Sequence, residues 1–96
     1  MTLPLALPQG MTCYKTTTHF TRDNVPKSLL ASHSVKEGVW GLLRVARGRI
    51  RYCVDGNPSS SEIVCGGECA VIAPDTPHHV EFIDTEGAFF IEFYRT

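Results

Sequence analysis

From residue 38 onward, the hydrophobic positions form short runs separated by turns that contain Gly, Pro, Asn or Asp. Residues 49–54 alternate between polar and apolar side chains, which is the period of a half-buried strand. The pattern predicts strands at residues 39–45, 49–54, 62–65, 69–73, 78–83 and 88–94. Short strands at this spacing are typical of a sandwich or barrel, so the sequence predicts an all-β fold.

The first third of the chain has a weaker pattern. Residues 14–22 are rich in threonine and are predicted as an edge strand, whereas residues 26–33 suit one or two helical turns. The apolar start is short, is interrupted by Pro4 and Pro8, and has no basic region before it, so we do not predict a signal peptide. We therefore expect an N-terminal arm at residues 1–13, followed by one domain at residues 14–96.

Length, charge and hydropathy narrow the class of protein. With 96 residues the chain suits a single domain, small enough to benefit from a metal or a partner subunit. The net charge of −1 gives no broad attraction to nucleic acid or to an anionic membrane. No apolar run approaches the roughly 20 residues that span a bilayer. We expect a cytoplasmic protein that binds neither nucleic acid nor membrane.

The four cysteines are compatible with reduced thiols, which is the expectation for a chain without an export signal. The segment from Cys65 to Cys69 has one residue more between its cysteines than the common metal-binding CxxC, and no second pair follows. A structural zinc ion at these two residues is therefore a minor alternative.

His78 is the strongest candidate for a metal ligand. It follows the turn formed by residues 74–77, and it shares a strand face with Val80 and Phe82. That face is the more apolar one, so we expect it to point inward. An inward histidine needs a hydrogen-bond partner or a metal ion, and neutral imidazole is a common ligand of zinc, iron and nickel.

Two further residues complete the candidate set. His33 precedes the strand at 39–45 by one loop, and Glu92 lies in an apolar run, where a carboxylate needs a cation or a donor. The alternative for Glu92 is an ion pair with Arg44, Arg51 or Lys36. His19 is expected to be exposed, and His79 is expected to face outward beside His78.

Several segments together resemble a known family. They are His33–Gly41 (H-x-x-K-x-G-x-W-G), Val45 and Gly48, Pro74–His78, and Glu92–Tyr94. The likeness extends from about residue 14 to residue 95. On these residues the chain resembles the small cupin-like domain found at the N-terminus of some tellurite-resistance TehB proteins and also as stand-alone proteins.

The resemblance implies a cupin double-stranded β-helix, a small jelly-roll barrel that commonly holds a divalent metal at its mouth. His78 matches the histidine of the second cupin motif, and His33 falls near the start of the first. The first motif lacks its H-x-H, Glu37 lies where the second histidine would fall, and the expected glutamate position falls near Gly41. The resemblance thus implies an altered metal site of His33 and His78 with Glu92 or water. Zinc is the first expectation, with iron or nickel as alternatives.

Three functions remain open from the sequence. The first is a metal-binding protein that binds or senses a small anion or metabolite, helped by Lys36, Arg44 and Arg51. The second is a metal-dependent enzyme of the dioxygenase or isomerase type. The third is a non-catalytic homodimeric module, because Phe90 and Tyr94 add an apolar outer face to the last strand. Methyl transfer is not expected, since these residues contain no Gly-rich nucleotide-binding turn.

Overall fold

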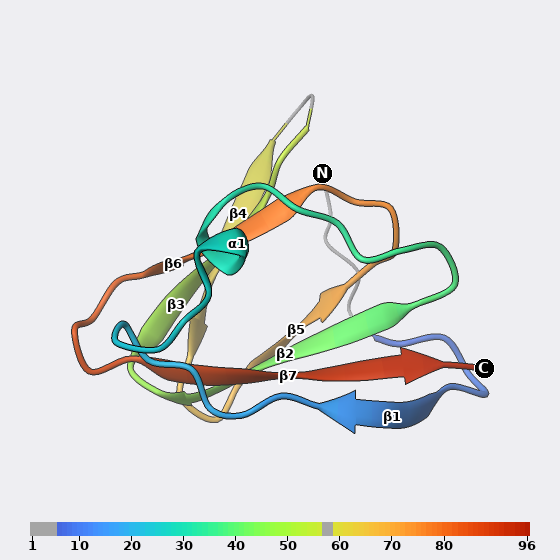
Figure 1. Cartoon of the computed structure of the whole chain (residues 1–96), viewed down its shortest axis with the longest axis horizontal. Coiled ribbons are helices and arrows are strands. Elements are labelled where there is room, and N and C mark those ends of the chain that lie inside the picture. The colour runs from blue at the N-terminus through green and yellow to red at the C-terminus, as the bar shows by residue number, and fades with distance from the viewer. Residues whose placement is uncertain (1–5, 57–58) are drawn as a thin grey trace.

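The chain folds into two antiparallel β-sheets (Figure 1). The structure, a computed structural model, describes residues 6–56 and 59–96. One sheet has four strands in the order β1-β7-β2-β5, and the other has three strands in the order β4-β3-β6. The elements are β1 (Thr12–Thr16), α1 (Lys27–Leu30), β2 (Trp40–Arg47), β3 (Arg49–Val54), β4 (Ser60–Cys65), β5 (Cys69–Ile72), β6 (His78–Phe82) and β7 (Ala88–Arg95). Within the described ranges the sheets stay separate and do not form one closed barrel.

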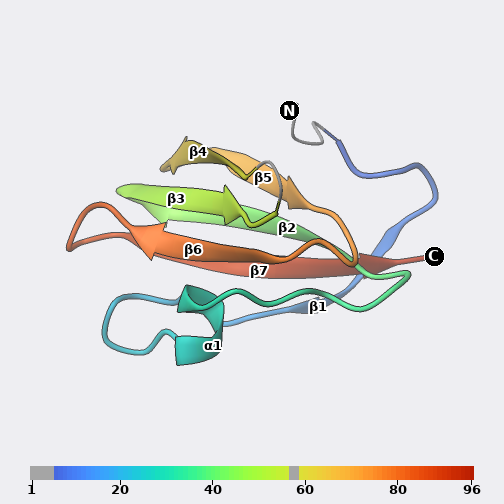
Figure 2. The same cartoon turned by 90° about the horizontal axis from the view of Figure 1, so that it is seen from above.

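The predicted all-β class is confirmed. The six strands expected after residue 38 are all present, and their ends differ from the prediction by no more than two residues. The predicted edge strand is shorter and earlier than expected, at Thr12–Thr16, where it pairs with β7 at the edge of the four-stranded sheet. The predicted helical turn is the four-residue helix α1, which lies beside β6 (Figure 2).

Two tight turns carry the chain from one sheet to the other. The first, at Gly48, joins β2 to β3, and the second, at Gly66 and Gly67, joins β4 to β5. The amide of Gly66 donates to the carbonyl oxygen of Gly48 at 2.9 Å, so the two turns pack against each other. Gly48 has a φ of 69°, in the left-handed region where a side chain is disfavoured. Glycine at this position lets β2 and β3 fold into different sheets.

The hydrophobic core lies between the facing sides of the two sheets. Because side chains alternate along a strand, the strands from β2 to β7 direct alternate residues toward this core, whereas β1 is exposed along its whole length. The largest fully buried side chains are Tyr52, Phe89, Leu43, Ile50, Ile72 and His78. His78 is the one buried polar or charged residue in the described part of the chain, so the alternation that builds the core also places an imidazole inside it.

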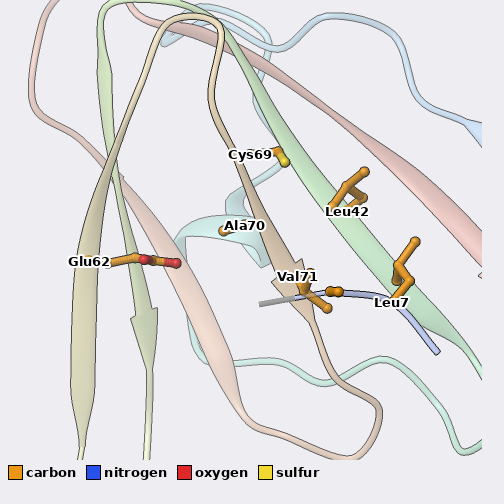
Figure 3. A pocket seen from close by; sticks show the side chains of 7 residues that line it. Leu7, Leu42, Glu62, Cys69, Ala70 and Val71 are labelled. Atoms are coloured by element: carbon orange, nitrogen blue, oxygen red, sulfur yellow. The ribbon is translucent and has the colours of Figure 1, made fainter. Parts of the chain in front are cut away.

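The predicted N-terminal arm is described in part. Residues 1–5 lie outside the described residues, Ala6 and Leu7 lie against the β2–β5 region, and Thr12 and Cys13 already belong to β1. A cavity of about 220 Å³ lies there, lined by Ala6, Leu7, Leu42, Glu62, Cys69, Ala70 and Val71 (Figure 3). The described helix is far too short and polar to cross a membrane.

Candidate metal site

His78 is the first residue of β6, and its side chain points into the core. Only 2% of the residue is exposed, and Val80, on the same strand face, is also buried. The preceding turn includes Asp75 with a φ of 55°, a conformation uncommon for a residue other than glycine. The inward orientation expected from the alternation is therefore confirmed, and the turn at residues 74–77 sets it.

His33 reaches the same place from the loop that follows α1. The amide of His33 donates to the carbonyl oxygen of His78 at 2.9 Å, and the amide of His78 donates back at 2.8 Å. This antiparallel bridge brings the two imidazole rings edge to face, with centroids 4.3 Å apart. The structure thus brings together two of the three residues that the sequence singled out.

Each imidazole has its tautomer set by a main-chain carbonyl two residues earlier. Nδ1 of His33 lies 2.9 Å from the oxygen of Ala31, and Nδ1 of His78 lies 2.7 Å from the oxygen of Thr76. A carbonyl oxygen only accepts, so both Nδ1 atoms carry the proton and donate. The lone pair of each ring is therefore on Nε2. Metal-binding histidines commonly have this arrangement.

The surroundings favour the uncharged form of His78. Burial lowers the pKa of His78 below its ordinary value, while the hydrogen bond to the Thr76 carbonyl acts in the opposite direction. The nearby charge of His33 lowers this pKa further. The ring of Tyr52 lies 5.7 Å from that of His78, and burial also raises the Tyr52 pKa, so its phenol keeps its proton. Neutral imidazole is the form that binds metal.

Glu92, the third predicted ligand, is not brought to the histidine pair. Its Oε1 lies 2.6 Å from Nε of Arg44 and accepts a hydrogen bond from the Tyr94 hydroxyl at 3.2 Å. Phe89 and Ile91 are buried in the core, so the alternation of β7 puts Glu92 on the outer face of the four-stranded sheet. The ion pair with Arg44 that the sequence left open as an alternative is the observed one. Glu37 is exposed in the turn before β2.

The remaining histidines and the paired cysteines lie elsewhere. His19 is exposed and its ring lies 4.6 Å from that of Phe90. His79 faces away from the core, as expected, but it is not free: its two nitrogens contact Asp55 and Glu81. Cys65 and Cys69 are exposed free thiols at the β4–β5 turn. They do not join any group of three potential metal ligands within the described residues.

Sequence reasoning missed one polar cluster, on the outer face of the three-stranded sheet. Cys53, His79 and Glu81 each offer a ligand atom, and these atoms lie within 4.8 Å of one another. Alternation along β3 and β6 places these residues on the outer faces of their strands. Their proximity depends on the pairing of Cys53 with His79 across the two strands, and alternation within one strand does not reveal such a register.

The fold is a small two-sheet β domain in which the buried His78 of β6 lies beside His33. Residues 15–91 match the model of the TehB-like domain family, which is most of the chain. The chain belongs to this TehB-like family, and the resemblance inferred from residues 33–41 and 74–78 is confirmed.

Related proteins extend this result. The chain is 27% identical over 86 residues to TehB of Haemophilus influenzae strain KW20, named a "Probable S-adenosyl-L-methionine-dependent methyltransferase". The match covers 85% of this chain but only 30% of that protein. The chain therefore matches less than a third of its relative's length.

Solved structures agree on the fold. The crystal structure of Haemophilus influenzae TehB superposes with a TM-score of 0.83 at 24% identity, covering 92% of this chain and 32% of that one. A crystal structure of a protein from Escherichia coli strain K12 gives 0.85 at 23% identity, covering 95% and 96%. At this level of identity the two likenesses establish a shared fold.

Proposed function

We propose that this chain is a metal-binding TehB-like domain in which Nε2 of His33 and Nε2 of His78 hold one divalent ion. The supporting observation is the pair of buried or half-buried rings, 4.3 Å apart, whose Nδ1 atoms both donate to carbonyl oxygens. Zinc suits neutral imidazole nitrogen, with iron or nickel as alternatives. When bound, the ion supplies a Lewis-acid centre with open coordination positions.

We further infer that the two sheets are the halves of a cupin jelly roll. β2, β5 and β7 belong to the four-stranded sheet, whereas β3, β4 and β6 belong to the three-stranded sheet. The chain therefore crosses repeatedly from one sheet to the other between β2 and β7. Repeated crossing between two antiparallel sheets is the pattern of a double-sheet jelly roll. In this arrangement the histidine pair lies at the start of β6, with the His78 side chain buried between the layers.

The occupant of the open metal positions is proposed to be water or a small anion or metabolite. Glu92 is held by Arg44 on the outer face, so the protein itself contributes two nitrogens. Arg51 is also paired, with its Nε 3.4 Å from Oε1 of Glu81. Attraction of an anion would therefore come from the bound ion more than from these arginines. The proposal is binding or sensing of a small anion, with tellurite-like oxyanions as the chemical class.

Catalysis is the weaker candidate. A two-histidine, one-carboxylate iron site requires a carboxylate beside His33 and His78, and the nearest sequence candidate, Glu92, is not there. The methyltransferase activity in the relative's name belongs to a much longer protein, and we do not propose it for these residues.

Metal analysis of the protein purified without chelator tests the proposal. We expect His78→Ala to bind one equivalent less zinc than the wild type, because one of two ligands is lost. Zinc added to chelated wild-type protein should raise the melting temperature, since a ligand of the folded state stabilises it. The matched control is His19→Ala, which removes an exposed histidine and should leave both measurements unchanged. Equal zinc content in His78→Ala and wild type would contradict the proposal.

A further inference from the structure

The outer face of the three-stranded sheet carries a cluster of mixed ligand types, apart from the histidine pair. Cys53 of β3 lies directly opposite His79 of β6, and Glu81 lies two residues further along β6. Directly opposite residues on one face have Cβ atoms about 4.5–5.5 Å apart, and residues i and i+2 share that face. His78 points to the other side of the same strand, so the two clusters are separated by the sheet.

Asp55 sets the orientation of His79. Nδ1 of His79 donates to Oδ2 of Asp55 at 2.8 Å, which fixes the orientation of the ring. Nε2 of His79 makes a hydrogen bond with Oε2 of Glu81 at 3.0 Å, and an ion bound by both atoms would replace this hydrogen bond. A carboxylate on one imidazole nitrogen, with the other nitrogen turned to a ligand, is the arrangement found behind many zinc-bound histidines.

The separations are close to those of a zinc site. Zn–N and Zn–O bonds of about 2.0–2.2 Å at a tetrahedral angle place the nitrogen and oxygen about 3.3 Å apart. The Nε2–Oε2 separation of 3.0 Å is near that value, and the Cys53 sulfur lies within 4.8 Å of both partners. Cys53 is a free thiol and is buried, with 8% of the residue exposed, so its sulfur lies on the protein side of the cluster.

The surroundings of the cluster leave Oε2 of Glu81 facing His79 and leave a cavity open to solvent beside it. Arg51 contacts Oε1 of Glu81 at 3.4 Å, which leaves Oε2 on the side of His79. A cavity of about 300 Å³ opens beside Cys53, Asp55 and His79 and is lined further by Val54 and Ser59–Ser61, giving an ion and its water a path from solvent.

We propose that Cys53, His79 and Glu81 form a second zinc site, on the outer face of the sheet, with Asp55 as the residue that positions His79 and water as the fourth ligand. The set of one sulfur, one nitrogen and one oxygen, with an open position, suits zinc. Binding releases the thiol proton of Cys53 to solvent as the Zn–S bond forms. The site is independent of the interior pair.

Cobalt titration of the chelated full-length protein tests this site, because Co²⁺ replaces Zn²⁺ and reports sulfur ligation by a thiolate-to-cobalt absorption band. The interior pair has no sulfur and gives no such band, so failure of one site is distinguishable from failure of the other. We expect the band in the wild type, and its loss when zinc is added. It should be absent in Cys53→Ser and retained in Cys65→Ser, which changes an exposed cysteine instead.

Two further variants separate ligand from positioning roles. Glu81→Gln should weaken cobalt binding by removing an oxygen ligand, while the band at saturation remains. Asp55→Asn should weaken it by about 10-fold or more while leaving the shape of the band unchanged, because Asp55 acts only through His79. Absence of the band in the wild-type protein would overturn the proposal, whether or not Cys53→Ser folds. A band that persists in Cys53→Ser would overturn it as well.

Discussion

Neighbouring histidines on one strand have opposite surroundings. His78 is buried, donates to a main-chain carbonyl, and has its pKa lowered by burial. His79 faces outward between two carboxylates, and its hydrogen bond to Asp55 raises its pKa. The alternation of a strand is the cause, since a shift of one residue moves a side chain to the other face. The direction of each pKa shift therefore depends on which face of the strand carries the histidine.

The alternation of strand faces also predicts how much stability is lost when either of two adjacent phenylalanines is replaced by alanine. Phe89 is fully buried, with the rings of Phe20 and Phe82 at 5.6 Å, whereas Phe90 lies on the outer face against His19. We expect Phe89→Ala to lower the free energy of unfolding by about 3–5 kcal/mol, because it leaves a cavity in the core. Phe90→Ala should cost less than half as much. Urea denaturation measures both, and equal losses would contradict the assignment of faces.

The sequence predicted part of the site at this scale. His78 could be predicted because its strand has one clearly apolar face, and His33 because a family motif marked it. Glu92 could not be assigned, since β7 carries large apolar groups on both faces and the pattern does not say which one is inside. Cys53 and Glu81 were missed because their proximity depends on cross-strand register.

At the scale of the elements, tight turns direct consecutive strands into two different sheets. Apolar runs separated by Gly, Pro, Asn and Asp turns predicted the strands after residue 38, whereas the exposed β1 gave a weaker pattern and was predicted too late in the chain. The pattern did not predict the order of the strands, since β7 pairs with β1 and β2, which lie far from it in the sequence. Pairing between distant segments depends on tertiary packing, which a local pattern does not contain.

Two glycines with left-handed backbone make a matched test of the turns. Gly48 has a φ of 69°, and a Cβ there would lie 3.0 Å from Cα of Gly87, whereas Gly67 has a φ of 89° and open space around it. Gly67→Ala should lower the free energy of unfolding by about 1–2 kcal/mol through backbone strain alone. Gly48→Ala should lower it further, because the neighbouring backbone must also move. Thermal or urea unfolding compares them, and a Gly48→Ala protein as stable as Gly67→Ala would refute the close packing of this turn.

At the scale of the whole molecule, the family match covers residues 15–91, and the fold is shared with one much longer protein and with one of similar length. The all-β class followed from the strand pattern, and the family followed from a few spaced motifs. The separation of the strands into two sheets that do not close into one barrel was not predicted, because it depends on packing between distant segments.

We also propose that the chain forms a homodimer through the outer face of the four-stranded sheet. Trp40, Phe90 and Tyr94 are all half-exposed, and Trp40 pairs directly with Tyr94 between β2 and β7. Aromatic residues grouped on a sheet face are typical of an interface between identical subunits. Light scattering at micromolar concentration should give twice the monomer mass. A monomer mass would contradict this proposal without affecting the metal sites.

The proposed binding of one metal ion by His33 and His78 can be tested directly. Crystals grown with zinc, measured at wavelengths on either side of the zinc absorption edge, locate each ion directly by anomalous scattering. We expect a peak about 2.0–2.1 Å from Nε2 of both residues. A zinc-soaked crystal with no peak between these rings, while other zinc ions are visible on the molecule, would contradict it.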